Sequence, residues 1–438
     1  MSKQLESRKE ELLEKVSGFV SKRMSGAKGK AAQAFIDHYY KNVPPADMEE
    51  RDPEDLYGAA ISMWTWGQVR KENEAKIRVY NPRMEQHGWH STHTVIEIAN
   101  DDMPFLVDSV AMELSRLNLT VHLIVHPVFS AERDKDGKLL DLSTDVKSGK
   151  RESYMTLEVD EQTSEEALSA IENGLFKILS DVRAAVEDWP EMREKAKEQI
   201  QLFTKTPPKT SSKEEYDELH QYMRWIHDDN FTFLGYTEMK YGSGDKYLEV
   251  VDGSGLGVLR DKNITLIEGL KELGNLSSDI RDKVDALGVL RITKASIRST
   301  VHRRVHMDTI AIKIFDAKGK AVGEKIFAGL FTSEAYNQSP RDIPLLRRKV
   351  KNVIDQLGLG TNSGHMTKAI IHVVESYPRD ELFQISEEKL AEIAMSIVYL
   401  QERSRIALFV RQDPFERFIS ALVYVPKDRF SSSLREKI

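Results

Sequence analysis

The chain has 438 residues, of which 40% are hydrophobic and 30% charged, and its formal net charge is −7. This length predicts roughly two to four domains, each long enough to bury a core. The chain has no cysteine, which excludes disulfides, thiolate metal sites and a thiol nucleophile, and its negative charge argues against a nucleic-acid partner. It contains no signal-peptide core and no apolar run of about 18 residues, so we expect a cytoplasmic protein without a membrane partner.

The N-terminal region, residues 1–75, is predicted to be helical. Its helical pattern is interrupted at Gly26, at Pro44 and before Pro53, and Asp52 suits the start of a new helix. A short strand is expected directly after this region, at Ile77–Tyr80.

The most informative stretch of the sequence is His93–Asp134. It opens with alternating β-formers, which predict a strand that stops at Asn100-Asp101-Asp102. A helix is expected next, capped by Asp101 or Asp102 and with Pro104 in its first turn. Apolar residues at helical spacing then mark a face that must pack on a sheet, and a second strand is predicted at Leu119–Phe129.

A third strand, Tyr154–Val159, and a helix opened by the capping box Thr163–Glu166 complete a block over residues 76–190. Its order, β-α-β-β-α, is that of a ferredoxin-like domain without the fourth strand. We expect Ile77–Tyr80 to occupy the missing sheet position from the N-terminal side. Residues 191–212 are predicted to be more helix and a linker.

Residues 213–402 are predicted to form an antiparallel sheet with helices at its ends, which is an α+β arrangement. Gly242–Asp245 and Lys318–Lys320 have the composition of hairpin turns. The strands are expected at Phe231–Tyr241, Lys246–Val251, Ile297–His306, Thr309–Asp316 and Lys325–Phe331.

The last region, residues 403–438, is predicted to hold two strands around the turn Asp413-Pro414. Ser431 then starts a helix that the end of the sequence cuts off after about one turn. We expect that the chain is truncated inside a further domain.

Short distinctive stretches run from about Phe35 to the last residue. They are FIDHYYKNV, DLYGAA, IRVYNP, DDMPFLVDSV, FLGY, HRRVHMDTIAIKIFD, GLFTSEAY, ESYPRDELFQ and RFISALVYVPKDRF. Together they resemble the large bacterial NAD-specific glutamate dehydrogenases. In that family such stretches belong to the long N-terminal regulatory half, and the dehydrogenase domain lies downstream.

The resemblance implies an α+β chain with four parts besides the linker. Residues 1–75 would be the helical N-terminal region, 76–190 a ferredoxin-like ACT-type domain, 213–402 a PAS-like domain, and 403–438 the start of a truncated second ACT-like domain. It implies a parent enzyme that oxidatively deaminates L-glutamate to 2-oxoglutarate with reduction of NAD, which would be bound outside this segment. The implied partners are its own catalytic domain, other subunits of a homo-oligomer, and an amino-acid effector.

The turn after the first strand of the ACT-like block is the candidate ligand site, formed by Asp101, Asp102, Met103, Phe105 and Leu106. Amides at a helix start suit the carboxylate of an amino acid, and a nearby carboxylate suits its ammonium. The alternative is a helix cap with a role in subunit contact. We favour this structural interpretation, because Phe105 stands where the usual ACT motif has a glycine.

Other candidate motifs are weaker. His87, His90 and His93 cross a loop into a strand, and the pairs His122/His126 and His302/His306 are each expected to share one strand face without the pattern of a metal site. Gly253–Gly257 separates two strands, whereas a dinucleotide loop joins a strand to a helix. We therefore predict no catalytic, cofactor-binding or metal-binding residues in this chain.

Three hypotheses follow from these patterns. The first is a regulatory and oligomerisation segment of a glutamate dehydrogenase, not catalytic by itself. The second is a stand-alone ACT-type amino-acid sensor. The third, an independent hydrolase or metal enzyme, depends only on the histidine pairs.

Overall fold

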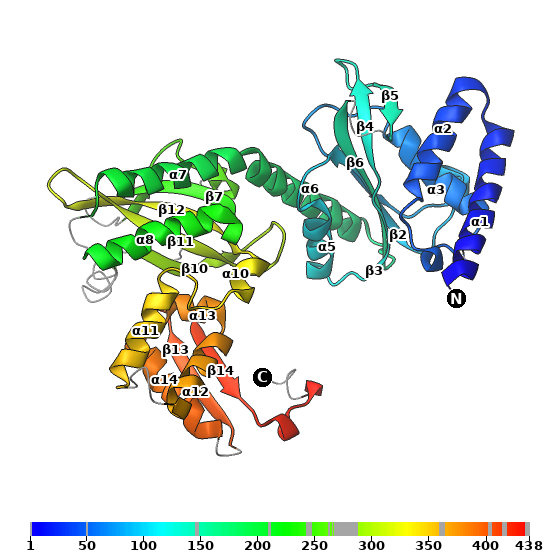
Figure 1. Ribbon diagram of the computed structural model, residues 1–438. Coiled ribbons are helices and arrows are strands. Elements are labelled where there is room, and N and C mark those ends of the chain that lie inside the picture. Colours follow the sequence, from blue (N-terminus) through cyan, green and yellow to red (C-terminus); the bar gives the residue numbers. More distant parts are fainter. Residues whose placement is uncertain are drawn as a thin grey trace. The chain divides into compact units, whose positions relative to one another are not determined.

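A computed structural model describes residues 2–49, 51–144, 149–208, 212–241, 248–261, 263–264, 266, 288–358, 364–401, 405–413 and 418–433. The chain divides into two compact units, Met1–Val186 with Thr300–Arg304, and Glu187–Ser299 with Val305–Ile438. Both units combine helices with antiparallel sheets, which confirms the predicted α+β class (Figure 1). Within the described ranges, no helix has the length and apolar character needed to cross a membrane.

The first unit begins with helices, as predicted. Asp52 starts one of them, since its side chain accepts a hydrogen bond from the Glu54 N–H at 2.7 Å and Pro53 occupies the first helical position. The helices are α1 (Ser2–Arg23), α2 (Gly26–Tyr39), η1 (Pro45–Asp47), α3 (Pro53–Trp66), α4 (Met84–His87), α5 (Leu106–Arg116) and α6 (Glu165–Glu187). The strands are β1 (Lys76–Tyr80), β2 (Thr94–Asp101), β3 (Val121–Val125), β4 (Val128–Arg133), β5 (Leu139–Ser143) and β6 (Lys150–Val159).

The sheet of the first unit has the order β1-β2-β6-β4-β5, and β3 also pairs with β6. Strand β1 lies antiparallel to β2, with Ile77 opposite Ile98. The prediction that Ile77–Tyr80 fills the missing ferredoxin-like position is therefore confirmed. The predicted single strand Leu119–Phe129 is wrong, because it is broken between β3 and β4 at Pro127, whose nitrogen has no hydrogen to donate to a ladder.

Helices cover both faces of this sheet. Helices α1, α2 and α3 lie on one face and α5 and α6 on the other (Figure 1). The face toward α1–α3 carries an aromatic core that includes Phe35 and Tyr39 of α2, Phe129 of β4 and Tyr154 of β6. The rings of Phe35 and Phe129 stack with centroids 5.0 Å apart.

The second unit is built on a second antiparallel sheet, of order β10-β11-β12-β7-β8, with β9 paired to β7. Its strands are β7 (Phe231–Tyr241), β8 (Leu248–Val250), β9 (Leu256–Gly257), β10 (Leu290–Arg298), β11 (His306–Phe315) and β12 (Ala321–Phe331). Its helices are α7 (Trp189–Lys205), α8 (Lys213–Trp225), η2 (Ile226–Asn230), η3 (Val258–Arg260), α10 (Ser333–Asn337), α11 (Leu346–Gln356), α12 (Gly364–Ser376), α13 (Arg379–Gln384), α14 (Glu387–Gln401) and η5 (Lys427–Arg429). The antiparallel sheet was predicted, and its PAS-like character stays a prediction.

One strand of this sheet was placed wrongly. The predicted strand Ile297–His306 is instead the end of β10, a turn through Thr300–Arg304, and the first residue of β11. His302 lies in that turn with a left-handed φ of 68° and does not share a strand face with His306. The predicted turn Gly242–Asp245 lies outside the described residues.

The predicted strands of the last region are present as a hairpin of β13 (Ala407–Gln412) and β14 (Ile419–Tyr424). On one side of this hairpin Phe409, Leu422 and Tyr424 pack against the core of the second unit. The helix predicted from Ser431 is described only as far as residue 433.

Candidate functional site

The turn at Asp101-Asp102 differs from its prediction. Strand β2 continues through Asp101, which pairs with Glu152 of β6. Helix α5 begins only at Leu106, and the residue before it, Phe105, has a φ of 71° and no side-chain cap. The predicted cap by Asp101 or Asp102 is therefore wrong, because the sheet ladder takes the first residue and three residues separate the second from the helix.

The carboxylate of Asp101 is held by two arginines. Its Oδ1 accepts a hydrogen bond from Arg70 at 2.8 Å, and its Oδ2 accepts one from Arg183 at 2.7 Å. Burial alone would raise the pKa of Asp101, but the hydrogen bonds and charges of these arginines outweigh it and lower the pKa. Asp102 pairs with Arg151 at 2.7 Å.

The other predicted ligand residues lie at the start of α5. Leu106 is buried, while Met103 and Phe105 are half-buried. The Phe105 ring lies 5.1 Å from the ring of His302, whose segment belongs to the first unit. The backbone N–H of His302 donates to Ser109 Oγ at 3.0 Å, and its Nδ1 lies 2.9 Å from Asp108 Oδ2. The five predicted ligand residues are thus near one another in the sequence, but none of them lines the cavity described below.

A row of buried carboxylates, not predicted from the sequence, lies on the face of the sheet toward α1–α3. Register pairs place Glu97 opposite Thr156 and Asp101 opposite Glu152, and Glu158 follows on the same side of β6. Each carboxylate has an arginine partner: Arg78 for Glu97, Arg70 for Asp101 and Glu152, Arg133 for Glu152, and Arg51 for Glu158. Alternation of charged with apolar residues usually indicates that one face of a strand is exposed to solvent. The sequence pattern therefore did not predict that helices cover this face of the sheet.

Two buried carboxylates on this face have pKa values that are shifted in opposite directions. Burial would raise the pKa of Glu152, but hydrogen bonds from Arg133 and Arg70 outweigh it and lower the pKa. Burial also raises the pKa of Glu97, and Arg78, with smaller contributions from Tyr80 and Lys76, only partly compensates, so that pKa stays raised.

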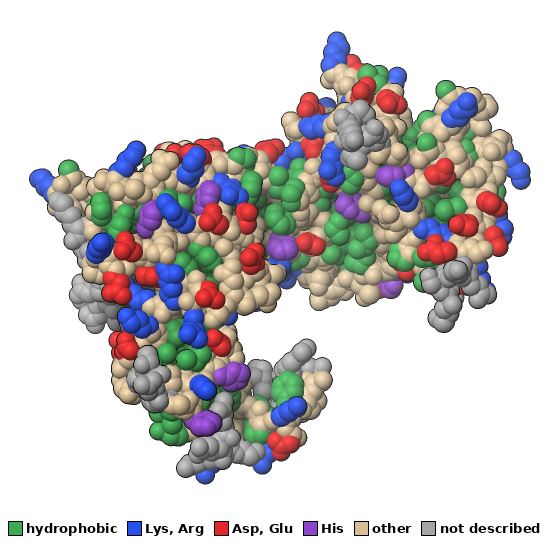
Figure 2. All heavy atoms as spheres, in the orientation of Figure 1, with side chains coloured by type: hydrophobic (Ala, Val, Ile, Leu, Met, Phe, Trp, Pro, Cys, Tyr) green, Lys and Arg blue, Asp and Glu red, His purple; other side chains and the backbone are tan. Residues whose placement is uncertain are grey.

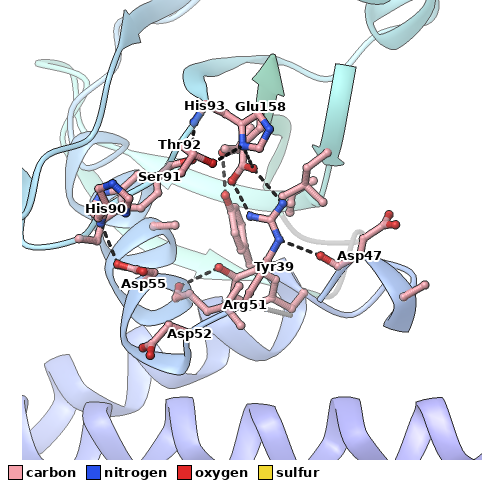
Figure 3. Close-up of a pocket in the computed structure, with 18 residues that line it drawn as sticks. Tyr39, Asp47, Arg51, Asp52, Asp55, His90, Ser91, Thr92, His93 and Glu158 are labelled. Carbon is pink, nitrogen blue, oxygen red and sulfur yellow. Dashed lines mark hydrogen bonds and ion pairs between the residues drawn. The ribbon is translucent and has the colours of Figure 1, made fainter. Parts of the chain in front are cut away.

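A cavity of about 500 Å³ opens at the Glu158 end of this face (Figure 3). The Arg51 guanidinium holds Glu158 with two hydrogen bonds, of 2.6 and 2.8 Å, and its Nε donates to the backbone oxygen of Asp47 at 2.7 Å. Across the cavity the His90 N–H donates to Asp55 Oδ1 at 2.7 Å. The cavity is lined by Tyr39, Tyr40, Ala46, Asp47, Arg51, Asp52, Asp55, Leu56, Ala59, Trp89, His90, Ser91, Thr92, His93, Leu123, Val125, Thr156 and Glu158.

Two tyrosines line this cavity. The Tyr39 hydroxyl donates to Thr156 Oγ1 at 2.6 Å, and the Tyr40 hydroxyl donates to the backbone oxygen of Leu56 at 2.7 Å. Both tyrosines are fully buried and burial raises their pKa values, so they stay neutral donors. For Arg51, burial would lower the pKa, but the contact with Glu158 raises it, and the pair stays ionic.

The predicted histidine groups are dispersed. His87 accepts a hydrogen bond from the Arg83 N–H, whereas His93 lies 3.6 Å from Glu158 and its ring centroid is 4.4 Å from that of His122. His122 in turn pairs with Asp160 at 2.8 Å, and this contact together with hydrogen bonds from Thr120 lowers the pKa of Asp160 to about 2. Among the described residues no group of three His, Asp or Glu side chains has a geometry that suits a metal ion.

The charged surface is mixed. On the face of each unit drawn in Figure 2, described Lys and Arg side chains alternate with Asp and Glu, and neither sign forms a broad patch.

Three family models match this sequence. The model "Glutamate dehydrogenase, ACT1 domain" matches residues 35–175, "Glutamate dehydrogenase, helical motif 1" matches residues 343–403, and "Glutamate dehydrogenase, ACT2 domain" matches residues 407–438. The first of these includes the whole sheet of the first unit and the cavity beside Glu158.

Curated relatives are similar over most of the chain. The NAD-specific glutamate dehydrogenase of Halomonas elongata is 37% identical over 434 residues, which is 98% of this chain and 27% of that protein. The one from Pseudomonas aeruginosa is 36% identical over 413 residues, 92% of this chain and 25% of that protein. The one from Mycobacterium tuberculosis is 27% identical over 343 residues, 78% of this chain and 20% of that protein. The chain thus spans about a quarter of the length of the first two relatives.

Proposed function

The chain belongs to the family of NAD-specific glutamate dehydrogenases, and from this we propose that it is a regulatory and oligomerisation segment of such an enzyme. The parent enzyme would convert L-glutamate, NAD and water to 2-oxoglutarate, ammonia and NADH. Its NAD and its reacting groups would lie outside these residues. The partners would be its catalytic domain and further copies of the same chain.

One observation supports this proposal most directly. Residues matched by the ACT1 model form a six-stranded sheet in which β1, β2, β6 and β3 follow the ferredoxin-like order, with β1 in the place of the usual last strand. Modules of this type act by binding a small molecule or another subunit, and such binding changes an enzyme only through different affinities for two states. A regulatory segment needs a packed sheet and a partner surface, and it needs no reacting groups of its own.

Two measurements on the 438-residue chain test the proposal. We expect no glutamate-dependent formation of NADH, because the catalytic groups would be elsewhere, and we expect self-association in sedimentation or light scattering. Measurable NADH formation would overturn the regulatory role. A chain that stays monomeric at about 100 μM, a concentration well above the Kd of a stable oligomer, would overturn the oligomerisation role.

A second candidate is a free amino-acid sensor that acts on a separate partner. The cavity beside Glu158 favours it, because a built polar cavity is what a binding module requires. If this segment and a catalytic domain are found in one polypeptide, the hypothesis of a stand-alone sensor is excluded.

Several expectations from the sequence stay predictions. They are the ligand site at Asp101, Asp102, Met103, Phe105 and Leu106, the five-part division of the chain, and a cytoplasmic location. Calorimetry with amino acids on the Asp102→Ala variant tests the first of them.

A further inference from the structure

The connection between β10 and β11 differs from an ordinary hairpin loop. Its residues Thr300–Arg304 belong to the first unit, whereas the strands before and after it belong to the second. Hairpin loops are usually exposed, but Val301 is fully buried. Two backbone hydrogen bonds close the loop, from the Ser299 N–H to Val305 O at 2.8 Å and from the Arg303 N–H to Val301 O at 2.9 Å. The loop is therefore a compact body that packs in the first unit.

The start of α5 is the surface on which this loop lies, and we call Phe105, Asp108 and Ser109 the seat. Ser109 is fully buried, and its Oγ accepts a hydrogen bond from the His302 N–H at 3.0 Å. Asp108 Oδ2 lies 2.9 Å from His302 Nδ1, and the ring centroids of Phe105 and His302 are 5.1 Å apart. A buried hydroxyl needs a hydrogen-bond partner, and the loop supplies one to Ser109. All three side chains of the seat thus contact one residue of the loop.

This contact is held by few interactions and has a cost. His302 and Phe105, which face each other across it, both have a left-handed backbone, with φ of 68° and 71°. Residues other than glycine are strained in this conformation, and such residues are frequent at clamps and switch regions. The side chains of His302 and Asp108 are 32% and 57% exposed, so water weakens their pairing. A contact of this kind opens more easily than the core of a domain.

We propose that Thr300–Arg304 is a strap that binds the seat reversibly, as an internal ligand of the first unit. When the strap is bound, the Ser109 hydroxyl is paired and the start of α5 is held. When the strap is released, the seat is free for another chain segment with the same chemistry, an apolar residue followed by a backbone N–H that reaches Ser109. The inference rests on the proposed regulatory function and deepens it, because a reversible contact gives the segment two states that a partner can select.

Hydrogen exchange on the 438-residue chain tests whether the strap opens by itself. Ile310 is fully buried in β11, which has a neighbouring strand on both sides, and its amide is the reference. We expect the His302 amide to exchange at least about tenfold faster than the Ile310 amide, through an opening that exposes little surface and is insensitive to dilute urea. Equal rates with the same dependence on urea would show a permanent contact and would overturn the strap.

A pair of serine variants on one helix tests the seat. Ser109→Ala removes the acceptor of the His302 N–H with little change in volume, so we expect the His302 amide to exchange about tenfold faster or more. Ser115→Ala is the matched control, because Ser115 is exposed near the other end of α5. Since alanine favours a helix, neither variant should unfold α5. An unchanged rate in Ser109→Ala, or the same increase in both variants, would contradict the assigned seat.

A peptide added in trans tests whether the seat is a binding surface. The probe is a head-to-tail cyclic peptide of residues 299–305, and the receiving chain carries Val301→Asp, which puts a charge in a buried position and should release the strap. Ala317→Asp, at an exposed turn position between β11 and β12, is the control chain. The control keeps its own strap at an effective concentration in the millimolar range, so it should bind the peptide at least about tenfold more weakly.

The outcomes separate the strap from the regulatory function. Equal binding of the peptide to both chains, or no binding to a folded Val301→Asp chain at about 1 mM peptide, would overturn the seat as a binding surface. If Val301→Asp does not fold, the Ser109→Ala chain takes its place in the hydrogen-exchange test, which then decides alone. The tests of NADH formation and self-association involve neither the strap nor the peptide, so the regulatory segment stands or fails independently.

Discussion

At the scale of single residues, the buried carboxylates of β2 differ in how they affect the stability of the fold. Asp101 and Glu97 lie on the same face of one strand, and both are nearly excluded from solvent. Two arginines hold Asp101, whereas Arg78 is the one arginine that pairs with Glu97 within the described residues, and Glu97 Oε1 finds no hydrogen-bond partner there. A buried carboxylate stabilises the fold only when its partners repay the cost of removing it from water.

We expect Asp101→Asn to lower the free energy of unfolding by about 3 kcal/mol, because it leaves two arginines with an uncharged partner in a buried site. Asp102→Asn is the neighbouring control. Its ion pair with Arg151 is exposed on the arginine side, so the loss should stay below about 1 kcal/mol. Urea unfolding measures both values, and equal losses in the two variants would contradict the assigned role of Asp101.

The pH dependence of stability should show the same ion pairs. The folded pKa values of Asp101 and Glu152 are lowered, so their contribution is complete above the unfolded value of about 4 and is lost as the pH falls through the folded values. Asp101→Asn should therefore flatten the fall in unfolding free energy below about pH 4. An unchanged slope in that variant would show that Asp101 does not take part in the acid transition.

Glu97 should behave in the opposite way. Its raised folded pKa means that the folded protein binds this proton more tightly than the unfolded chain, so ionised Glu97 costs stability above the unfolded pKa. Glu97→Gln should change the free energy of unfolding at pH 7 by less than about 1 kcal/mol, or raise it. Urea titrations at pH 5 and pH 7 measure this, and a loss as large as that of Asp101→Asn would refute it.

At the scale of elements, the start of α5 combines two features. Phe105 has the left-handed backbone that glycine adopts easily, and it keeps a side chain that contacts His302. The chain therefore places a side chain at a backbone conformation that favours glycine, directly before the helix. The strain is a local cost, and the ring contact and the packing of α5 offset it.

Two substitutions at Phe105 separate strain from contact. Phe105→Ala removes the ring and keeps the strained backbone, whereas Phe105→Gly removes both. We expect the Gly variant to be more stable than the Ala variant by about 1 kcal/mol in thermal unfolding. At Asn173, exposed within α6, the order should reverse, since glycine weakens an ordinary helix by a similar amount. Ala more stable than Gly at both positions would contradict the strain.

At the scale of the whole molecule, each compact unit has a core of its own. The core of the first unit joins α1–α3 to its sheet, and the core of the second joins α7, α8 and α11–α14 to the other sheet. Units with separate cores usually unfold as separate cooperative steps.

Calorimetry should therefore show two thermal transitions in the 438-residue chain. Leu114→Ala, at a fully buried position of α5, should lower one of them, and Phe327→Ala, at a fully buried position of β12, should lower the other. Each substitution removes about 3 to 5 kcal/mol from its own unit. A single transition that both variants lower equally would show that the units unfold as one.

The candidate site was predictable only in part. The sequence predicted the helix after β2 and the family motif around it. The spacing of apolar residues and a sequence motif can both be recognised within one short segment. It wrongly made Asp101 a candidate helix cap, since Asp101 lies in β2 and the arginines that hold it come from residues 70 and 183. It also gave no sign of the cavity, whose walls come from four separated segments that only the fold brings together.

The sequence by itself determined the α+β class, most strands and helices, the edge position of Ile77–Tyr80 and the family. Those features follow from the alternation of side chains along one segment, and the edge position follows from counting the strands that a known sheet order requires. Only the tertiary structure decided which face of β2 and β6 is covered, and therefore which carboxylates are buried and paired. The distinctive DDMPF turn thus marks the family, while the polar cavity lies at the far end of the same sheet, where distant residues meet.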